Sequence, residues 1–385
     1  MSISSTHQVF PGYANLAYDP ASQSGRLTPE ETITSMSLKK SIEPPRHAHT
    51  DYNFKTPSNS LLVNSQGKAE SYNSAYEVFE YPGEFENEGE GTHYSKLRHE
   101  ESQARQQTFN ASTSARGVAT GHLLNTVCKD NPALSKTLLV IGTLITVHES
   151  EPEASGGAQS DFDCQFEAIE SSQPFRPERK SRKPQVKGPL PALVVGPEGR
   201  EIHTDEFGRI KIQFYWDRYG KHNQDSSCWV RVASPVAGKG WGFVAIPRIG
   251  QEVVVSFEDG DPDRPLVTGV AYNAEQTVPY PLPEHKTVSG WRSQSSEKGS
   301  PSNFNELRFE DKIGSEYVWF QAEKDYLSLI KNNSNTEIRG HSHSLIHGNL
   351  IEEIKADVSR TVLGQLSQQI DKALHLTVND DVLAK

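Results

Sequence analysis

The sequence predicts a mainly β protein with a first α+β region, a small barrel and a C-terminal stem built from repeated strands. Only 34% of the 385 residues are apolar, whereas 28 are glycine and 23 are proline, a composition that favours strands, turns and extended segments over a helical bundle. Short runs of alternating polar and apolar residues recur after residue 192, and an eight-residue repeat fills the C-terminus. These three observations define the predicted fold class.

Residues 1–173 are expected to form the first domain. Residues 94–116 contain neither proline nor glycine and are rich in Glu, Gln, Arg and Ala, which predicts a helix. Strands are expected at 138–147 and 161–170, with a loop rich in Gly, Ser and Glu between them. The apolar run at 138–147 has ten residues, too few for a membrane-spanning helix, so it fits a buried strand or a pair of strands.

Residues 174–191 hold five prolines and six Lys or Arg residues. Proline keeps such a segment extended and the charges keep it solvated, so we predict a linker. The formal net charge of the chain, −11, disfavours binding to nucleic-acid phosphates and docking on anionic lipid.

Residues 192–275 are expected to form a compact barrel. Runs that alternate or are rich in β-branched side chains cover residues 209–214, 229–232, 251–257 and 266–270. About five short strands fit the closed oligonucleotide/oligosaccharide-binding (OB) barrel. A nucleic-acid or sugar binding module is therefore one alternative. Against it, residues 187–275 contain 10 Lys or Arg and 12 Asp or Glu, which make no positive groove.

Residues 276–302 are rich in proline and serine and predict a connector. Residues 303–385 are expected to form the stem, beginning with strands near 305–312 and 316–320.

The stem contains the most specific pattern in the sequence. Seven β-branched residues, which we call the octad anchors, follow one another at intervals of eight: Ile330, Ile338, Ile346, Ile354, Val362, Ile370 and Val378. A second apolar set lies four positions after four of these anchors: Leu350, Val358, Leu366 and Leu374. A small residue lies two positions after four anchors: Gly340, Gly348, Ala356 and Gly364.

This repeat predicts an intertwined, triple-stranded β-helix. Even offsets fall on one face of a strand, so the anchors and the second apolar set share a face, and the small residue allows the backbone to turn. Eight residues span only about 27 Å when extended, too short to enclose a core within one chain. Three chains that each supply one face per turn bury the apolar stripe, which predicts an obligatory homotrimer with these eleven residues as its core.

No catalytic site is predicted. The densest carboxylate cluster comprises Glu258, Asp259, Asp261 and Asp263 on one Gly-Pro loop, whereas a glycosidase needs two carboxyl groups across a cleft. Residues 238–242 are glycine-rich but lack the spacing of a phosphate-binding loop, so a hairpin connection is expected there.

No cofactor and no metal site are predicted either. Of the three stem histidines His341, His343 and His347, the first two form a His-Ser-His pair, and a trimer would bring three such pairs to one level, which suits octahedral metal ligation. His341 and His343 lie at odd offsets from Ile338, however, and are expected to point outward. Cys128, Cys164 and Cys228 have no metal-ligand spacing and are expected to be buried or indifferent thiols in a reducing cytoplasm.

The octads and several longer motifs resemble the VgrG (valine–glycine repeat) family of type VI secretion spikes. The barrel motifs that carry the resemblance lie at 196–217, 227–232, 237–242, 246–253, 260–265 and 305–311. Residues 51–54 and 166–169 are similar to the later half of the family's hub domain, which itself resembles the tail hub of contractile phages. The resemblance implies a partial phage-hub-like domain, an OB-like barrel and a trimeric β-helical stem.

The resemblance also implies a non-enzymatic, mechanical function as a needle that punctures target envelopes and touches a membrane only in that way. The implied partners are an Hcp-like tail-tube protein, baseplate components, a PAAR-like tip cap and effectors. The N-terminus has no signal-peptide pattern, so the protein is expected in the cytoplasm before firing and outside the cell afterwards. A contractile phage-type tail spike is the nearest alternative.

Two departures from the family pattern are expected to matter. Other members have a further stretch of hub before the point where this sequence begins, so docking of the hub on the tail tube is an open question. An additional effector domain after the stem, which some members carry, is not expected.

Overall fold

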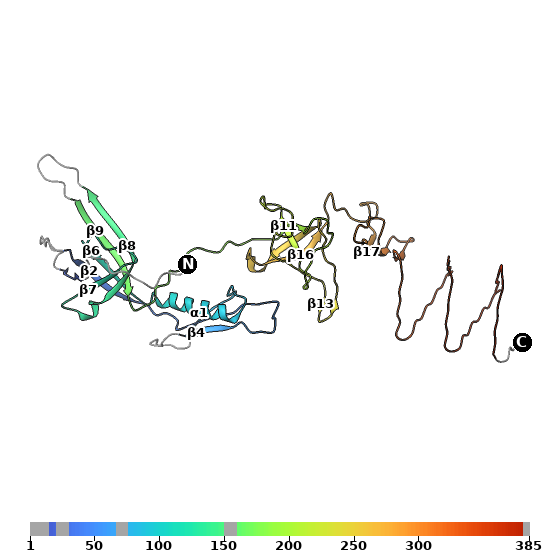
Figure 1. Cartoon of the computed structure of the whole chain (residues 1–385), viewed down its shortest axis with the longest axis horizontal. Helices are drawn as coiled ribbons and strands as arrows, with labels where there is room; N and C mark the ends of the chain where they lie inside the picture. Colours follow the sequence, from blue (N-terminus) through green and yellow to red (C-terminus); the bar gives the residue numbers. More distant parts are fainter. Residues whose placement is uncertain (1–14, 21–30, 67–75, 150–159, 380–385) are drawn as a thin grey trace. The chain divides into compact units, whose positions relative to one another are not determined.

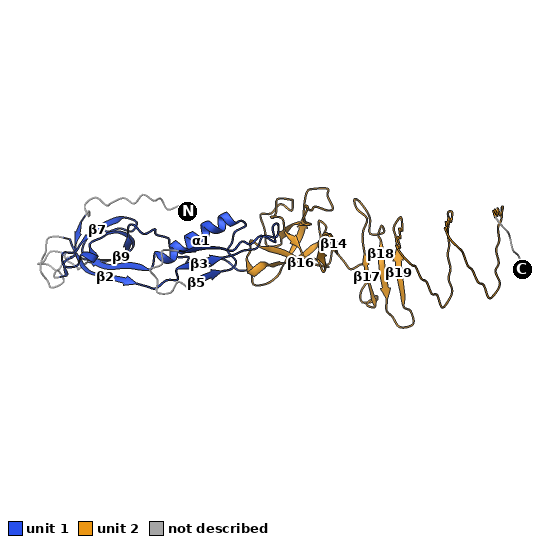
Figure 2. Cartoon of the chain, turned by 90° about the horizontal axis from the view of Figure 1, so that it is seen from below, with its two compact units in different colours: residues 1–186 blue, residues 187–385 orange. Residues whose placement is uncertain are grey.

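The computed structural model describes residues 15–20, 31–66, 76–149 and 160–379 (Figure 1). The chain divides into two compact units, residues 1–186 and 187–385, and the boundary falls inside the predicted 174–191 linker (Figure 2). The described residues contain no helix that is both long enough and apolar enough to cross a membrane. Most of the regular structure is strand, which confirms the predicted mainly β class.

The first unit contains a six-stranded sheet with the order β1-β7-β8-β9-β6-β2. Its strands are β1 (Leu16–Ala17), β2 (Ile33–Lys40), β6 (Gln107–Thr113), β7 (Leu123–Val127), β8 (Thr137–Glu149) and β9 (Ser160–Glu170). The long antiparallel hairpin of β8 and β9 confirms the strands predicted at 138–147 and 161–170. Phe109, Ile33 and Leu138 are fully buried in the core of this sheet.

A smaller sheet with the order β4-β3-β5 lies in the same unit. Its strands are β3 (Arg46–His49), β4 (Val63–Gln66) and β5 (Glu77–Glu80), and the helix α1 (Glu88–Gln103) packs against β3 and β4. The helix begins where the Asn87 side chain accepts a hydrogen bond from the Glu90 amide, at 3.0 Å.

The predicted helix at 94–116 was wrong in its second half. Residues 107–113 form β6, in which Phe109, Ala111 and Thr113 are buried at alternate positions. The alternation of buried and less buried residues, which is typical of a strand, therefore decided the structure of residues 107–113, although the composition around them favours a helix.

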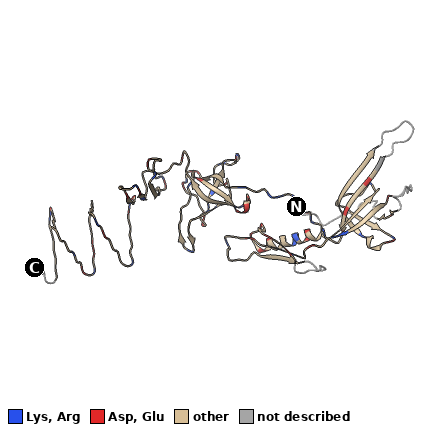
Figure 3. Ribbon diagram, turned by 180° about the vertical axis from the view of Figure 1, so that it is seen from behind, with Lys and Arg blue, Asp and Glu red and all other residues tan. Residues whose placement is uncertain are grey.

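The basic segment after β9 is extended, as expected of the predicted linker, but it is also attached to the first unit. Arg176 Nε lies 2.8 Å from a carboxylate oxygen of Glu100, and Arg179 Nη2 lies 2.6 Å from one of Glu80. Lys183 lies 3.4 Å from Glu84. Figure 3 shows the acidic and basic residues of α1, where Glu100 lies. Opposite charge therefore holds residues 176–183 against Glu80, Glu84 and Glu100 of this unit.

The second unit begins with a five-stranded sheet of order β11-β10-β15-β16-β12. Its strands are β10 (Leu190–Val195), β11 (Lys211–Phe214), β12 (Arg231–Val232), β15 (Glu252–Phe257) and β16 (Pro265–Ala271). Ile210 and Val230, which precede the two edge strands, exchange both backbone hydrogen bonds at 2.9 Å. This bridge joins the edges, so the sheet closes into the predicted OB-like barrel around an aliphatic core.

Two further groups of strands lie in the second unit. β13 (Ala237–Gly238) and β14 (Trp241–Gly242) form the hairpin predicted for the glycine-rich stretch. β17 (Val288–Arg292), β18 (Glu306–Glu310) and β19 (Tyr317–Gln321) form an antiparallel sheet. β18 and β19 confirm predicted strands, whereas β17 lies inside the predicted connector and was not foreseen.

Candidate trimer interface

Residues 322–379 follow β19 as an extended chain with regularly spaced bends (Figure 1). Between Ile330 and Val378 the bends fall at 331–332, 339–340, 347–348, 355–356, 363–364 and 371–372, and thus at intervals of eight residues. Each bend comes one and two positions after an octad anchor. Gly340, Gly348, Ala356 and Gly364 therefore lie where the backbone turns, as the repeat predicted.

The octad anchors are only half covered within one chain. Their exposed fractions range from 42% at Ile370 to 56% at Ile354. In the second apolar set they range from 59% at Leu366 to 69% at Val358. Burying a fully exposed side chain of this kind is worth about 1.5–3 kcal/mol, and because each of these is already partly covered, an assembly would gain roughly half of that per side chain. Their role as a trimer core stays a prediction.

The two sides of the stem strands differ in polarity. Glu337 and Arg339 approach to 3.1 Å across Ile338, and Glu353 and Lys355 approach to 3.9 Å across Ile354. Such contacts between residues two positions apart place both partners on the side opposite the anchor. At Ile338 and Ile354, therefore, the apolar anchor and an ion pair lie on opposite sides of the chain, as a buried face and a solvent face require.

The backbone of the stem is also available for pairing. In the described residues 322–379 no backbone–backbone hydrogen bond is formed. These exposed amides and carbonyls are therefore open to pairing with strands of other chains, and they would need such partners if the stem were buried in an assembly.

The sheet before the stem contains a buried ion pair that sequence reasoning missed. The Glu306 side chain is 1% exposed, and its carboxylate accepts hydrogen bonds from Arg292 Nε at 2.9 Å and Tyr280 Oη at 2.8 Å. The guanidinium of Arg292 stacks 4.0 Å from the Phe304 ring centre. Burial and the contact with Glu306 raise the pKa of the Tyr280 hydroxyl. The sequence Glu-Leu-Arg-Phe-Glu at 306–310 predicted a strand, but nothing in it indicated that the side chain of Glu306 would be buried.

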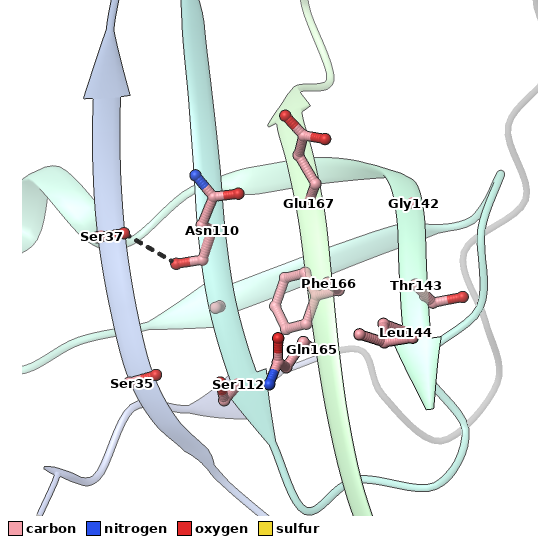
Figure 4. A pocket seen from close by; sticks show the side chains of 11 residues that line it. Ser35, Ser37, Asn110, Ser112, Gly142, Thr143, Leu144, Gln165, Phe166 and Glu167 are labelled. Atoms are coloured by element: carbon pink, nitrogen blue, oxygen red, sulfur yellow. Dashed lines mark hydrogen bonds between the residues drawn. The ribbon is translucent and has the colours of Figure 1, made fainter. Parts of the chain in front are cut away.

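A shallow hollow of about 380 Å³ lies on the six-stranded sheet of the first unit (Figure 4). Ser37 donates a hydrogen bond to the Asn110 carbonyl at one side, and Leu144 and Phe166 lie at the other. Glu167 supplies the one carboxylate of its lining. This arrangement offers no acid–base pair for hydrolytic chemistry.

The carboxylate cluster at 258–263 and the three cysteines were the other groups considered for chemistry. Glu258–Gly260 form a single helical turn, after which Asp261 accepts a hydrogen bond from the Asp263 amide at 2.9 Å. Among the described residues, no group of three His, Cys, Asp or Glu side chains is placed to hold a metal ion. Cys128 and Cys164 are buried, Cys228 is exposed, and all three are free.

Three family models match the chain in succession. Residues 1–151 match the phage tail baseplate hub, and residues 199–272 match the type VI secretion system/phage-baseplate injector OB domain. Residues 289–384 match the bacteriophage T4 gp5 C-terminal trimerisation domain. A hub, an injector barrel and a trimerisation stem in this order define the class of hub-and-spike proteins of contractile injection systems.

Within that class, the chain belongs to the VgrG family of type VI secretion spike proteins. It is 40% identical over 336 residues to the type VI secretion system spike protein VgrG1a of Pseudomonas aeruginosa, a match that covers 87% of this chain and 52% of the relative. It is 37% identical over 327 residues to the actin cross-linking toxin VgrG1 of Vibrio cholerae, covering 84% of this chain and 29% of that protein. The chain spans about half the length of the spike relatives it matches.

Among solved structures, the chain is similar to the E. coli c3393 protein, a type VI secretion component described as resembling the T4 tail proteins gp27 and gp5. That similarity has a TM-score of 0.39 at 18% identity and covers 67% of this chain and 49% of the other. The assignment to the VgrG family therefore relies on the sequence relatives and the family models.

Proposed function

We propose that this chain forms a structural homotrimeric spike, the needle of a type VI secretion system, and that it acts mechanically. One observation carries the proposal. Bends recur every eight residues, and the apolar anchors beside them are left 42–56% exposed on one side of a chain that has polar pairs on the other.

The proposed trimer explains how such a chain becomes a stiff needle. Each octad supplies one strand to a face of a three-sided prism, and its amides and carbonyls pair with strands of the two partners. The apolar anchors then fill the centre of the prism, where water is excluded. A shaft bonded in this way along its whole length can transmit the thrust of a contracting sheath.

The proposed partners follow from the domain order and from what the relatives are called. The hub end is proposed to dock on an Hcp-like tail-tube protein and baseplate components. The tip is proposed to carry a PAAR-like cap or an effector. One relative is named a toxin, which supports effector carriage within the family. We propose a cytoplasmic location before firing and release through the type VI machine.

A phage-type tail spike is the second candidate, because the hub model matched by residues 1–151 describes a phage baseplate. The spike relatives at 39–40% identity are type VI proteins, which favours the first candidate. Deletion of the gene in its own bacterium separates them. Loss of tail-tube protein from the culture medium supports a type VI spike, and unchanged release supports a phage-type tail.

The experiment that tests the spike itself is light scattering on a sizing column. The full chain, 42.8 kDa as a monomer, is compared with a version that ends after Phe320. We expect a trimer that dissociates when residues 321–385 are removed. A full-length monomer would contradict the proposal and would turn attention to the OB barrel as a binding module.

A further inference from the structure

We propose that Glu352 and Arg360 set the register of the three chains in the stem by forming an ion pair between neighbouring protomers. This inference rests on the proposed trimeric spike and adds the residues that align its chains. It starts from two charged residues on the side of the strand that also carries the apolar anchors.

The contact of Glu353 with Lys355 places Glu352 on the anchor side. Those two side chains meet at 3.9 Å on the side opposite Ile354. Because successive residues of a strand alternate between its faces, Glu352 shares the face of Ile354. The same alternation places Arg360 on the face of Val362, two positions further along.

Glu352 and Arg360 are the two charged residues among those that lie six positions after an octad anchor, a set that we call the column. Both lie six positions after an anchor, and neither has an ion-pair partner in the described part of the chain. The column comprises Thr336, Ser344, Glu352, Arg360, Gln368 and Leu376. In the straight stretches between the described bends, Glu352 and Arg360 are the charged residues that share the anchor side.

The geometry of a three-sided prism brings the two charges together between chains. Each octad crosses one face and the next octad of the same chain crosses the next face. The strand stacked on a given octad therefore comes from a partner and lies one octad further along its sequence. Stacked strands are about 4.8 Å apart, so Glu352 of one protomer lies beside Arg360 of its neighbour. A trimer contains three such pairs, and their net charge is zero.

The apolar repeat cannot choose this register by itself. Every anchor is isoleucine or valine at the same spacing, so a slip of one octad again stacks anchor on anchor. The same slip places Glu352 beside Gln368 of the neighbour and Arg360 beside Leu376, leaving both charges unpaired near an apolar core. A single polar position fixes register in coiled coils for the same reason, because only one alignment satisfies it.

Cysteine cross-linking reads the register directly. Asn349 and Asp357 are one octad apart on the outer side, so Asn349→Cys with Asp357→Cys forms a disulfide between protomers only in the proposed register. Asn349→Cys with Gln365→Cys is the matched control, because these positions meet only after a slip of one octad. Both pairs are placed in the full chain with Cys228→Ser, which removes the exposed native thiol.

In the parent chain we expect cross-linked trimer from the first pair and almost none from the second. Neutralising the charges with Glu352→Gln and Arg360→Gln is expected to move a large share of the cross-linking to the slipped pair. Glu352→Arg alone places two arginines side by side and is expected to reduce the trimer. The exchange of Glu352→Arg with Arg360→Glu is expected to restore both the trimer and its register.

Two results overturn the inference in distinguishable ways. If the neutral double variant cross-links only through the first pair, the stem is trimeric but these charges do not set its register. If the parent chain is a monomer and neither cysteine pair cross-links, the proposed trimer itself is wrong.

Discussion

Arg292 and Glu306 are direct partners across the antiparallel pair of β17 and β18, and Arg292 Nη2 lies 2.8 Å from the Glu306 carboxylate. The Glu306 side chain is 1% exposed, so this carboxylate depends on its cations. Arg308 lies further away, at 3.7 Å. The pair ties together two strands of the sheet that leads into the stem.

Replacing Arg292 with methionine is therefore expected to destabilise the second unit. Removing one partner of a fully buried ion pair costs about 3–5 kcal/mol. Tyr280 and the more distant Arg308 remain beside Glu306, so we expect a loss at or below the lower end of that range. Urea unfolding at a constant protein concentration measures the loss. Tryptophan fluorescence is a selective probe, since all five tryptophans lie between residues 216 and 319. Arg200→Met is the control, because the exposed Arg200–Glu297 pair contributes about 0–1 kcal/mol. An equal loss of unfolding free energy in Arg292→Met and Arg200→Met would show that burial does not make the Arg292–Glu306 pair more important than an exposed pair.

The octad core makes a separate prediction. Ile354→Asp and Val362→Asp each place an unpaired charge in the proposed centre of the trimer, where desolvation costs several kcal/mol. We expect the double variant to run as a monomer in light scattering. Ser359→Asp, at an odd position, is expected to remain trimeric because its side chain faces solvent. A trimer in the double variant would show that the anchors do not form the core.

Glu80 is expected to make the stability of the first unit depend on acid. The pKa of Glu80 is lowered from 4.5 to about 2, first by His47, whose Nε2 lies 3.6 Å away, and then by Arg179. A pKa that is lower in the folded state adds stability above pH 4.5, and that stability is lost as the pH falls toward 2. The expected loss is about 1–3 kcal/mol after allowance for the partly exposed carboxylate.

Hydrogen exchange of amides in β3 and β5 measures this effect between pH 5 and 2.5, after correction for intrinsic exchange rates. We expect Glu80→Gln to remove most of the acid dependence, because the glutamine cannot titrate. Glu86→Gln, at an exposed glutamate of the same unit, serves as the control. The same slope in the parent and in Glu80→Gln would assign the effect to other groups.

The attachment of the basic segment predicts its sensitivity to protease. Arg179 contacts Glu80 at 2.6 Å and Glu101 at 3.7 Å, and these partly exposed pairs are weakened by salt. Cleavage by trypsin within residues 176–183 is therefore expected to speed up several-fold between about 0.05 and 0.5 M salt. Glu101→Gln is expected to raise the rate at low salt. Cleavage that ignores both changes would mean that the segment is held by something other than charge.

The predictions that held depended on residues close together in sequence. The hairpin of β8 and β9 followed from the apolar run at 138–147 and the loop rich in Gly, Ser and Glu before 161–170, and the bends of the stem followed from small residues placed two positions after an anchor. The helix predicted at 94–116 failed beyond residue 103, because its composition suits a helix whereas residues 107–113 pair with strands distant in sequence. The domain boundaries and the trimer core remain predictions.

The sequence by itself determined the β class, the barrel strands and the eight-residue rhythm of the stem, because alternation and spacing are local properties of a strand. Only the tertiary structure decided how the barrel closes, through Ile210 and Val230, and how Glu306 is buried beside Arg292. It also decided the attachment of Arg179 to Glu80, 99 residues apart. Contacts of this kind depend on which distant strands become neighbours, and no local pattern of side chains encodes that choice.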